Sequence, residues 1–426
     1  MTTSDTGGAG AGAPGARRVG VLADREFRGL WAAFGLSLAG DQLAQVALAV
    51  LVFQTTGSAA ATAAVFAVSL VPWLIGGPLL SGLGDRYPRR TVMVGCDLAS
   101  ALLVAAMALP GLSLPVLCGL LFVVVLLHAP FAAARSALVR DIFPDDRYTA
   151  ATAVSSLTRQ IALVAGFAAG GLLVAVLDPR EALLLDAASF IVSAAVVRLT
   201  VRARPAATVA AGGRRPVADL AAGARLVFGD RLLRTLTWYA WLAACHVGGE
   251  GVVVPLAAEN GGGPVAVGLL LAADAAGTSA GMIGLTRWVP PDRRIRLIPP
   301  LAVLAAVPFL ACATNPPLPV IWLLWLAAGA GTGYQLAANT AFVAAVPNER
   351  RAQAFGLVMT GLGLGQGAAI ITAGLLAQAT SPAFAVAGFG LVGTLAALTL
   401  AAGPGRTLTA QPHLGEPSTA SQRNPG

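Results

Sequence analysis

The 426-residue sequence contains no lysine, and all 28 of its basic residues are arginine. Without lysine the chain has neither a P-loop, which needs that residue at the nucleotide phosphates, nor a Schiff-base nucleophile. Charged residues make up only 11% of the chain, against roughly 25% in soluble domains. A water-soluble body is therefore excluded, because too little polar surface remains to cover it.

Cysteine and histidine are also scarce. The four cysteines all lie inside apolar runs without the short spacing of metal ligands, so we interpret them as reduced packing residues. The three histidines are too far apart to build a zinc site from local spacing. The sequence therefore predicts no metal site and no cofactor, and any uphill movement of a solute would need an ion gradient or another subunit.

Hydrophobic residues make up 56% of the chain and form twelve segments. Each segment is near the roughly 20 residues with which an α-helix crosses hydrocarbon. Helices are expected because backbone groups in lipid need partners within their own segment. The predicted spans are 30–53, 59–83, 91–110, 114–139, 151–177, 182–201, 232–257, 263–286, 297–313, 318–345, 352–378 and 382–402.

The arginines predict the orientation of these spans. If the first span enters from the cytosol, every arginine except Arg135, Arg159 and Arg180 falls in a cytosolic loop, helix end or tail. This positive-inside bias predicts a multi-pass protein of the bacterial inner membrane with both termini in the cytosol. The formal charge of +8 suits anionic lipid at these positions, so we expect membrane lipids and no nucleic acid as partners.

The two halves of the sequence repeat each other. Ser136 to Val139 and the following Phe-Pro-Asp-Asp-Arg match Thr340 to Val343 and the following Val-Pro-Asn-Glu-Arg, at an offset of about 204 residues. Such duplication is typical of secondary transporters, which bind solute between the halves near the midplane. The domains predicted are a flexible tail (1–26), a six-helix bundle (27–201), a cytosolic linker with an amphipathic helix (202–231), a second six-helix bundle (232–403) and a flexible tail (404–426).

The loop after the second span carries a known signature. Its run from Gly82 to Arg90, with the preceding Ser81, resembles the loop motif G-x-L-x-D-R-x-G-R-R of the major facilitator superfamily; Ser81 and Pro88 replace the two glycines of the motif. The resemblance implies an all-α membrane protein with twelve transmembrane helices in two pseudo-symmetric bundles. It also implies a cytosolic gate, to which we assign Asp85, Arg86, Arg89, Arg90, Asp97 and Arg135.

Further motifs refine this resemblance. Gly40-Asp41-Gln42, the run from Arg135 to Leu138 and the run from Leu185 to Phe190 look like the branch of bacterial multidrug, macrolide and siderophore exporters. The fifth span resembles a degraded antiporter signature that keeps Gly166, Gly170 and Gly171. Close helix packing is the alternative role of these three glycines, since small residues let helices approach.

Charges inside spans are costly and indicate function. Asp41 in the first span and Arg159 in the fifth lie at about the same depth, so we expect them to pair directly or through water. Protonation of Asp41 would then release Arg159. A permanent structural ion pair is the alternative.

The seventh span carries His246 and Glu250, four residues apart and hence on one helix face. They align with Asp41 and Gln45 of the first half, and either could carry a coupling proton because histidine titrates near physiological pH. The alternative for Glu250 is a place at the outer rim. Asp274, at mid-depth in the eighth span, could attract a cationic solute.

These features predict a proton-coupled exporter of small amphipathic compounds, acting as a monomer without enzymatic activity. Import of a nutrient and a non-transporting sensor are the alternatives. A hydrolase-like elbow, Gly277 to Gly281, lies within a predicted span and lacks the strand-turn-helix context it needs. We expect the solute site to be lined by Gln45, His128, Trp241, Asp274, Tyr334, Gln335 and Gln366, although packing is an alternative role for each.

Overall fold

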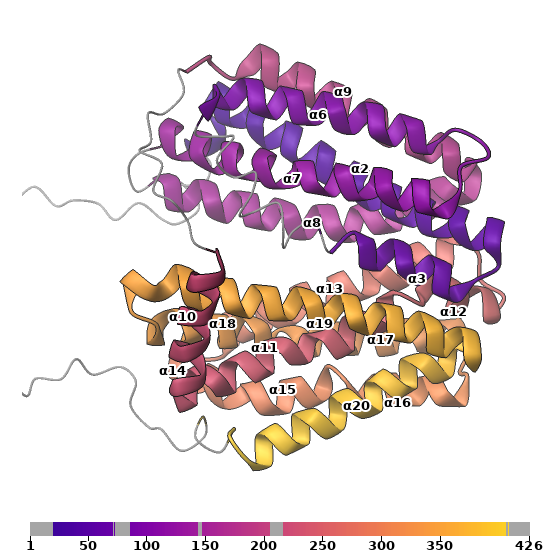
Figure 1. The fold of residues 1–426 in the computed structure, drawn as a ribbon, viewed down its shortest axis with the longest axis vertical. Coiled ribbons are helices and arrows are strands. Elements are labelled where there is room, and N and C mark those ends of the chain that lie inside the picture. The colour runs from indigo at the N-terminus through magenta and orange to yellow at the C-terminus, as the bar shows by residue number, and fades with distance from the viewer. Residues whose placement is uncertain are drawn as a thin grey trace, which may run out of the picture.

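The computed structural model describes residues 20–70, 72, 86–143, 147–204, 216–405 and 408, and every regular element within them is helical. Figure 1 shows two helical bundles, one built from α2–α9 and the other from α11–α20. The elements of the first bundle are α2 (Arg25–Thr56), α3 (Ala59–Val68), α6 (Arg89–Met107), α7 (Leu114–Ile142), α8 (Arg147–Val176) and α9 (Pro179–Thr200).

Local signals begin and end these helices. The Asp24 carboxylate accepts the N–H groups of Glu26 and Phe27 at 2.9 Å and so caps the start of α2. Gly57 ends that helix in the left-handed conformation, with φ of 62°, which glycine adopts without steric cost. The predicted second span, 59–83, begins with α3 and continues into residues outside the described part of the chain.

The second bundle contains more interrupted helices. Its long helices are α11 (Arg231–Glu250), α13 (Pro264–Trp288), α17 (Leu318–Thr332), α18 (Tyr334–Ala345), α19 (Arg351–Ala379) and α20 (Pro382–Ala402). Its short elements are α12 (Val253–Glu259), α14 (Pro291–Arg294), α15 (Ile298–Leu304) and α16 (Val307–Leu310), with 3-10 turns around them. The axes of α11 and α12 differ by 42° across the break, so the seventh span is bent.

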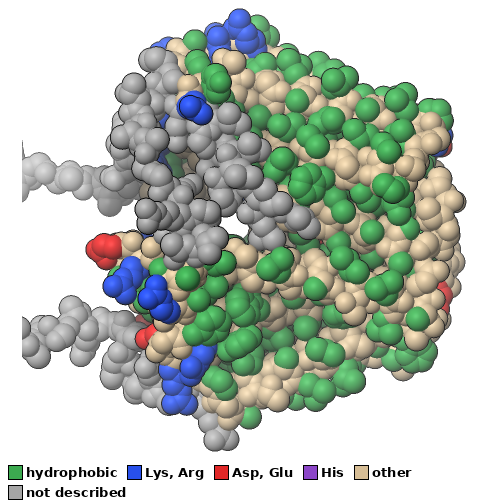
Figure 2. Space-filling model, viewed as in Figure 1, with side chains coloured by type: hydrophobic (Ala, Val, Ile, Leu, Met, Phe, Trp, Pro, Cys, Tyr) green, Lys and Arg blue, Asp and Glu red, His purple; other side chains and the backbone are tan. Residues whose placement is uncertain are grey.

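The described helices suit a bilayer. Ten spans are long and apolar enough to cross it, eleven if α11 and α12 form one span, and the apolar helix α3 begins another. Large apolar side chains such as Leu102, Val176 and Leu199 point outward, which lipid accommodates and water does not. Figure 2 shows apolar side chains over the flank of both bundles. The all-α membrane fold predicted from hydropathy is confirmed.

Arginine marks one end of the molecule, which we name the basic end. Figure 2 shows most of the visible arginine there, at the end where α10 lies in Figure 1. Of the described arginines outside the spans, only Arg180 lies at the other end, named the opposite end. Helix ends at the basic end carry Arg25, Arg89, Arg140, Arg147, Arg198, Arg231, Arg287 and Arg351.

The two bundles contact each other through α8 against α13 and α3 against α19. The closest approaches lie toward the opposite end. A Cβ on Gly268 would lie 2.6 Å from the Cα of Gly171, and a Cβ on Gly374 would lie 2.3 Å from the Cβ of Ala63. Only glycine permits such approaches. We name the contact between Gly171 and Gly268 the glycine seam.

The linker contains α10 (Pro216–Gly229), which runs across the spans at the basic end (Figure 1). It packs against α19 and α11, and a Cβ on Gly223 would lie 2.3 Å from the carbonyl oxygen of Gln353. Val227 is fully buried, whereas Leu220 and Phe228 stay exposed. The helix therefore has one face on the second bundle and leaves apolar side chains free on another.

Candidate functional site

The first bundle encloses a cavity of about 310 Å³ whose wall includes Asp41, His128 and Arg159. The Asp41 carboxylate lies 3.6 Å from His128 Nε2. Of the described residues, His128 and not Arg159 comes within ion-pair distance of Asp41. The expected pairing of Asp41 with Arg159 would thus need a bridging group inside the cavity that both side chains line.

Asp186 is a member of this cavity that we did not select from the sequence. It lies on α9, is 1% exposed and accepts a hydrogen bond from the Ser189 hydroxyl at 3.1 Å. A Cβ at Gly40 would lie 2.2 Å from its Oδ1, so glycine is needed beside Asp41 for α2 and α9 to pack. The sequence did contain a signal for Asp186, since an acidic residue in an apolar span indicates function.

Asp97 and Arg135 also lie inside the first bundle, although we expected them at the gate. They line a smaller cavity of about 80 Å³ next to Asp41. Asp97 is 2% exposed and accepts the Ser193 hydroxyl at 2.7 Å. The Arg135 guanidinium lies 3.8 Å from the centre of the Phe34 ring, a cation–π contact. Both side chains therefore help to hold the bundle interior together.

The described part of the signature loop, from Arg86 to Arg90, lies at the basic end. Asp85 is outside the described residues, and Arg86 is exposed. Arg89 forms an ion pair with Asp141 at the end of α7, and Arg90 donates to the carbonyl of Val201 at 3.2 Å. Asp141, which the sequence did not single out, is thus the described carboxylate that receives a loop arginine.

The second bundle holds a compact polar group around His246. Its Nδ1 lies 3.2 Å from the carbonyl oxygen of Ala305, and its Nε2 lies 2.7 Å from Asp274 Oδ1. A carbonyl oxygen only accepts, so Nδ1 carries hydrogen, and one proton lies between Nε2 and the carboxylate. Phe309 stacks on the imidazole with ring centres 5.1 Å apart. The ring is therefore fixed in orientation.

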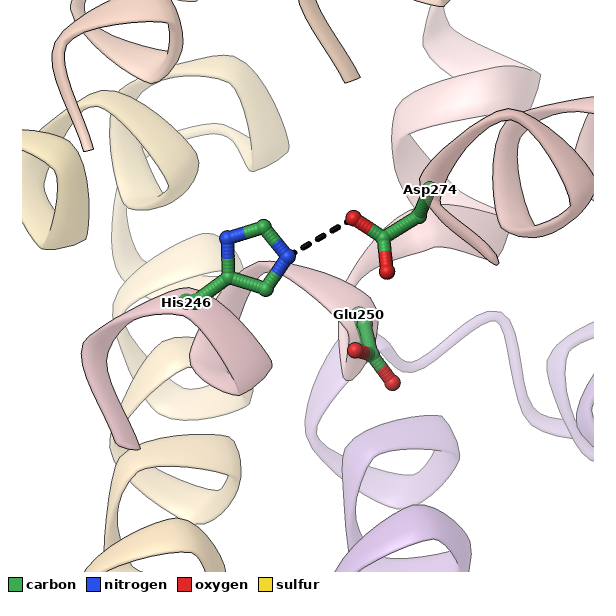
Figure 3. A group of neighbouring side chains, drawn as sticks. All are labelled: His246, Glu250 and Asp274. Atoms are coloured by element: carbon green, nitrogen blue, oxygen red, sulfur yellow. Dashed lines mark hydrogen bonds and ion pairs between the residues drawn. The ribbon is translucent and has the colours of Figure 1, made fainter. Parts of the chain in front are cut away.

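Glu250 completes this group at the break between α11 and α12. The ligand atoms of His246, Glu250 and Asp274 lie within 4.8 Å of one another. Figure 3 shows the imidazole directed at Asp274, with Glu250 beside that carboxylate. Sequence spacing placed His246 and Glu250 on one helix face, but it did not indicate Asp274, which lies 28 positions further along the chain on another helix.

The residues that we expected to line a solute site lie in different environments in the structure. Gln45 lines the 310 Å³ cavity, and Gln366 is half-buried on α19. Trp241 is also half-buried, and its Nε1 donates to the carbonyl of Val358 at 3.0 Å, which ties α11 to α19. Of the five lining candidates other than His128 and Asp274, Gln45 is the one that lines this cavity.

Tyr334 and Gln335 lie in a different environment. Tyr334 is 2% exposed in the core of the second bundle, and its hydroxyl donates to the Tyr239 carbonyl at 3.0 Å. The Gln335 amide donates to the Tyr334 hydroxyl at 2.8 Å. The pair therefore connects α18 to α11 rather than facing solute in this conformation.

The three glycines of the fifth span all lie at close helix contacts. A Cβ on Gly166 would lie 3.0 Å from Gln42 Cβ, and one on Gly170 would lie 3.1 Å from the Cα of Leu43. Gly171 forms the glycine seam with α13. Ser279, at the centre of the elbow-like run, lies inside α13 and donates to the carbonyl of Ala275 at 2.8 Å.

Comparison with known families decides the identity of this fold. The sequence pattern described as Major Facilitator Superfamily matches residues 30–298. The chain belongs to the Major Facilitator Superfamily. It is therefore a membrane transporter of small molecules, and the family predicted from the loop signature is confirmed. Members of this superfamily are in general transporters rather than enzymes.

Two curated relatives extend this assignment. The chain is 29% identical over 315 residues to multidrug efflux pump Tap of Mycobacterium tuberculosis, covering 69% of this chain and 73% of the relative. It is 23% identical over 181 residues to macrolide efflux protein A of Streptococcus pyogenes, covering 41% of this chain and 44% of that relative. The predicted likeness to the bacterial exporter branch is confirmed.

Solved structures agree on the fold. The nucleoside transporter NupG superposes with a TM-score of 0.72 at 14% identity, covering 88% of this chain and 98% of that one. A bacterial homologue of the human lysosomal transporter Spinster, solved in an inward-facing conformation, has a TM-score of 0.68 at 16% identity, covering 92% and 97%. At these identities the likeness supports the superfamily fold and not a substrate.

Proposed function

We propose that this transporter exports small amphipathic compounds, such as a drug, an antibiotic or a secondary metabolite, in exchange for protons. The observation that carries the proposal is the cavity in the first bundle. Its wall is mostly apolar, with Asp41, His128, Arg159 and Asp186 as the charged or titratable groups on it. An apolar cavity with few placed polar groups suits amphipathic solutes. The likeness to the two efflux proteins named above supports export as the direction of transport.

Asp41 is the proposed site of proton exchange. Its carboxylate shares the cavity with Asp186 and lies near His128, so binding a proton there removes a negative charge from a confined space. Cargo and proton would then compete for the same carboxylate. A proton crossing 100 mV of membrane potential gains about 2.3 kcal/mol, which is available to drive the cargo outward. His246 and Glu250 are the second candidates for this role.

Alternating access would move the bundles about this cavity. We assign the basic end to the cytosol, because arginine favours cytosolic loops. The glycine seam and the hydrogen bond from Ser58 to Gln378, 3.0 Å long, lie toward the opposite end. The structure then corresponds to a state closed toward the outside. Arg86, Arg89 and Arg90, with Asp85, would govern closure of the cytosolic end.

Efflux from bacterial cells tests this proposal. Cells expressing wild type, Asp41→Asn or Asp178→Asn would be loaded with a fluorescent cationic dye or a macrolide, with and without a protonophore. Asp178 is the matched control, since it is an exposed acid that caps α9 outside the cavity. We expect export at least tenfold slower in Asp41→Asn, wild-type rates in Asp178→Asn, and loss of export with the protonophore.

Two outcomes would contradict the proposal. Export that continues unchanged in Asp41→Asn and under the protonophore removes proton coupling at Asp41. Accumulation of the compound driven by the proton gradient would instead identify an importer. The amount of each variant in the membrane fraction, measured by immunoblot, separates loss of activity from loss of protein.

A further inference from the structure

The group at the bend of the seventh span has the composition of a metal site. It offers one imidazole nitrogen and two carboxylates, from His246, Glu250 and Asp274, with their ligand atoms within 4.8 Å of one another. Imidazole and carboxylate together suit first-row divalent ions such as Zn²⁺ and Mn²⁺. Local spacing in the sequence gave no indication of it, because Asp274 lies on another helix.

The hydrogen bond at the other ring nitrogen of His246 is also of the kind found in metal sites. A ligating histidine normally donates its other ring N–H to a carbonyl or carboxylate, which fixes the tautomer and the direction of the free nitrogen. His246 Nδ1 faces the Ala305 carbonyl at 3.2 Å, so Nε2 is the nitrogen left for an ion. Stacking on Phe309 holds the ring in this orientation.

The distances need only small adjustment. In a tetrahedral Zn²⁺ site with bonds of about 2.1 Å, neighbouring ligand atoms lie about 3.4 Å apart. His246 Nε2 and Asp274 Oδ1 are now 2.7 Å apart, joined by a proton. Replacing that proton with an ion would widen the pair by less than about 1 Å and draw Glu250 inward by no more than about 1.4 Å.

The charge favours an ion as well. Two carboxylates in the interior of a membrane protein need compensation. Among the described residues no arginine forms an ion pair with Glu250 or Asp274, and the described ion-pair partner of Asp274 is His246. A divalent cation bound with neutral imidazole would balance both carboxylates and leave a fourth position for water.

We propose that His246, Glu250 and Asp274 form a binding site for a divalent transition-metal ion at the bend of the seventh span. The ion would clamp the end of α11 to α13, the helix that carries Gly268 of the glycine seam. Its occupancy would thus stiffen the side of the second bundle that faces the first. This site is separate from Asp41 and does not require that the protein be an exporter.

Metal binding to the purified full-length chain tests the site. The protein would carry no polyhistidine tag, which itself binds metal, and would be titrated in detergent micelles with Zn²⁺ by calorimetry. Co²⁺ would serve as a spectroscopic substitute, because its visible absorption distinguishes thiolate from imidazole and carboxylate ligands. We expect one saturable site, a raised thermal unfolding midpoint with Zn²⁺, and no thiolate band.

Matched variants make the test specific. Glu250→Gln and Asp274→Asn keep the side-chain shape and should weaken binding at least about tenfold. Glu259→Gln is the control for the first, because Glu259 is an exposed acid on the adjoining α12, and it should bind as wild type does. Asp41→Asn should also bind normally, which separates this proposal from the one on export.

Three results would overturn the site. The first is no saturable binding by the wild type. The second is equal binding by Glu250→Gln, Asp274→Asn and wild type, which indicates an adventitious ion only. The third is a thiolate band that disappears in Cys245→Ala, since this half-buried thiol is the chain neighbour of His246.

Discussion

The two bundles carry related positions with different chemistry. At the offset that aligns Asp41 with His246, Gln45 aligns with Glu250, and Ser69 aligns with Asp274. Asp41, Gln45 and Ser69 all line the cavity of the first bundle, whereas the ligand atoms of their counterparts in the second bundle lie within 4.8 Å of one another. One duplicated framework thus carries separate polar groups along a mostly apolar cavity wall in one half and a compact polar cluster in the other.

The counter-ions differ as well. In the first bundle, acidic groups share the interior with Arg135 and Arg159, whose guanidinium groups lie near the Phe34 ring. In the second, His246 is the described basic partner of the cluster. Dispersed charges around a cavity leave room for a solute, and concentrated charges at a helix break favour a small cation. The first half is therefore better suited to cargo and the second to an ion.

The two histidines give the sharpest test of this contrast and the largest expected effect. His246→Leu removes the ion-pair partner of Asp274 from a group of two half-buried carboxylates, and breaking a largely buried pair costs about 3–5 kcal/mol. His128 lies 3.6 Å from Asp41 and its side chain is 25% exposed, so His128→Leu should cost less than His246→Leu, because the pair that it breaks is longer and less buried. Thermal unfolding of both purified variants measures the difference. Equal losses would show that the two halves hold their charges alike.

The glycine seam provides the next largest effect. A Cβ on Gly268 would lie 2.5 Å from the Phe167 carbonyl oxygen, so Gly268→Val should destabilise the bundle contact by about 1–3 kcal/mol and slow transport. Gly119 on α7 has open space around it, and Gly119→Val is the control. A Gly268→Val variant that unfolds and transports as wild type does would mean that the bundles do not need this close approach.

Asp97 and Ser193 test whether the interior of the first bundle is held by hydrogen bonds. Asp97→Ala leaves the Ser193 hydroxyl buried without its acceptor, at a cost of about 1–3 kcal/mol. The double variant with Ser193→Ala should recover part of the loss, because both polar groups are then removed. A double-mutant cycle of unfolding midpoints measures this coupling. Additive effects would show that the 2.7 Å contact contributes little.

The smallest expected effect lies at the rim of the basic end. Glu26 pairs with Arg204 and accepts the backbone N–H of Arg202 at 3.0 Å; the hydrogen bond to Glu26 raises the pKa of Arg204. Glu26→Gln should cost up to about 1 kcal/mol, as rim ion pairs do, and less in high salt. Unfolding midpoints at two salt concentrations give the value, and a loss independent of salt would exclude an ion pair as its source.

Hydropathy and the repeat were sufficient to predict much of this molecule. Each described span matches an apolar run, because lipid imposes both length and helical form. The repeat also related Asp41 to His246 before any coordinates. It did not reveal the break after Glu250, where three glycines occur in the run 248–251 and Gly251 packs tightly against Ile370. Bends of this kind depend on neighbours far away in sequence.

Contacts between distant helices were the part that sequence could not supply. Spacing within one helix identifies neighbours three and four residues apart, which is how His246 and Glu250 were paired. Spacing within one helix gives no information on which helices face each other. For this reason we expected Asp274 at a separate solute site and Asp41 beside Arg159. For Tyr334 the sequence left both roles open, since a polar aromatic residue on a span has the same pattern whether it faces solute or the core.

The glycine seam has a consequence for the speed of the transport cycle. Because it joins backbone to backbone, no side chains must leave one set of rotamers and enter another when the bundles separate there. When this contact separates and re-forms, dispersion energy is lost and regained, but the conformational entropy of side chains changes little. We therefore expect a small free-energy barrier from this contact when the bundles change state. Under the proposed function, the larger part of the barrier would depend on what the interior carboxylates bind.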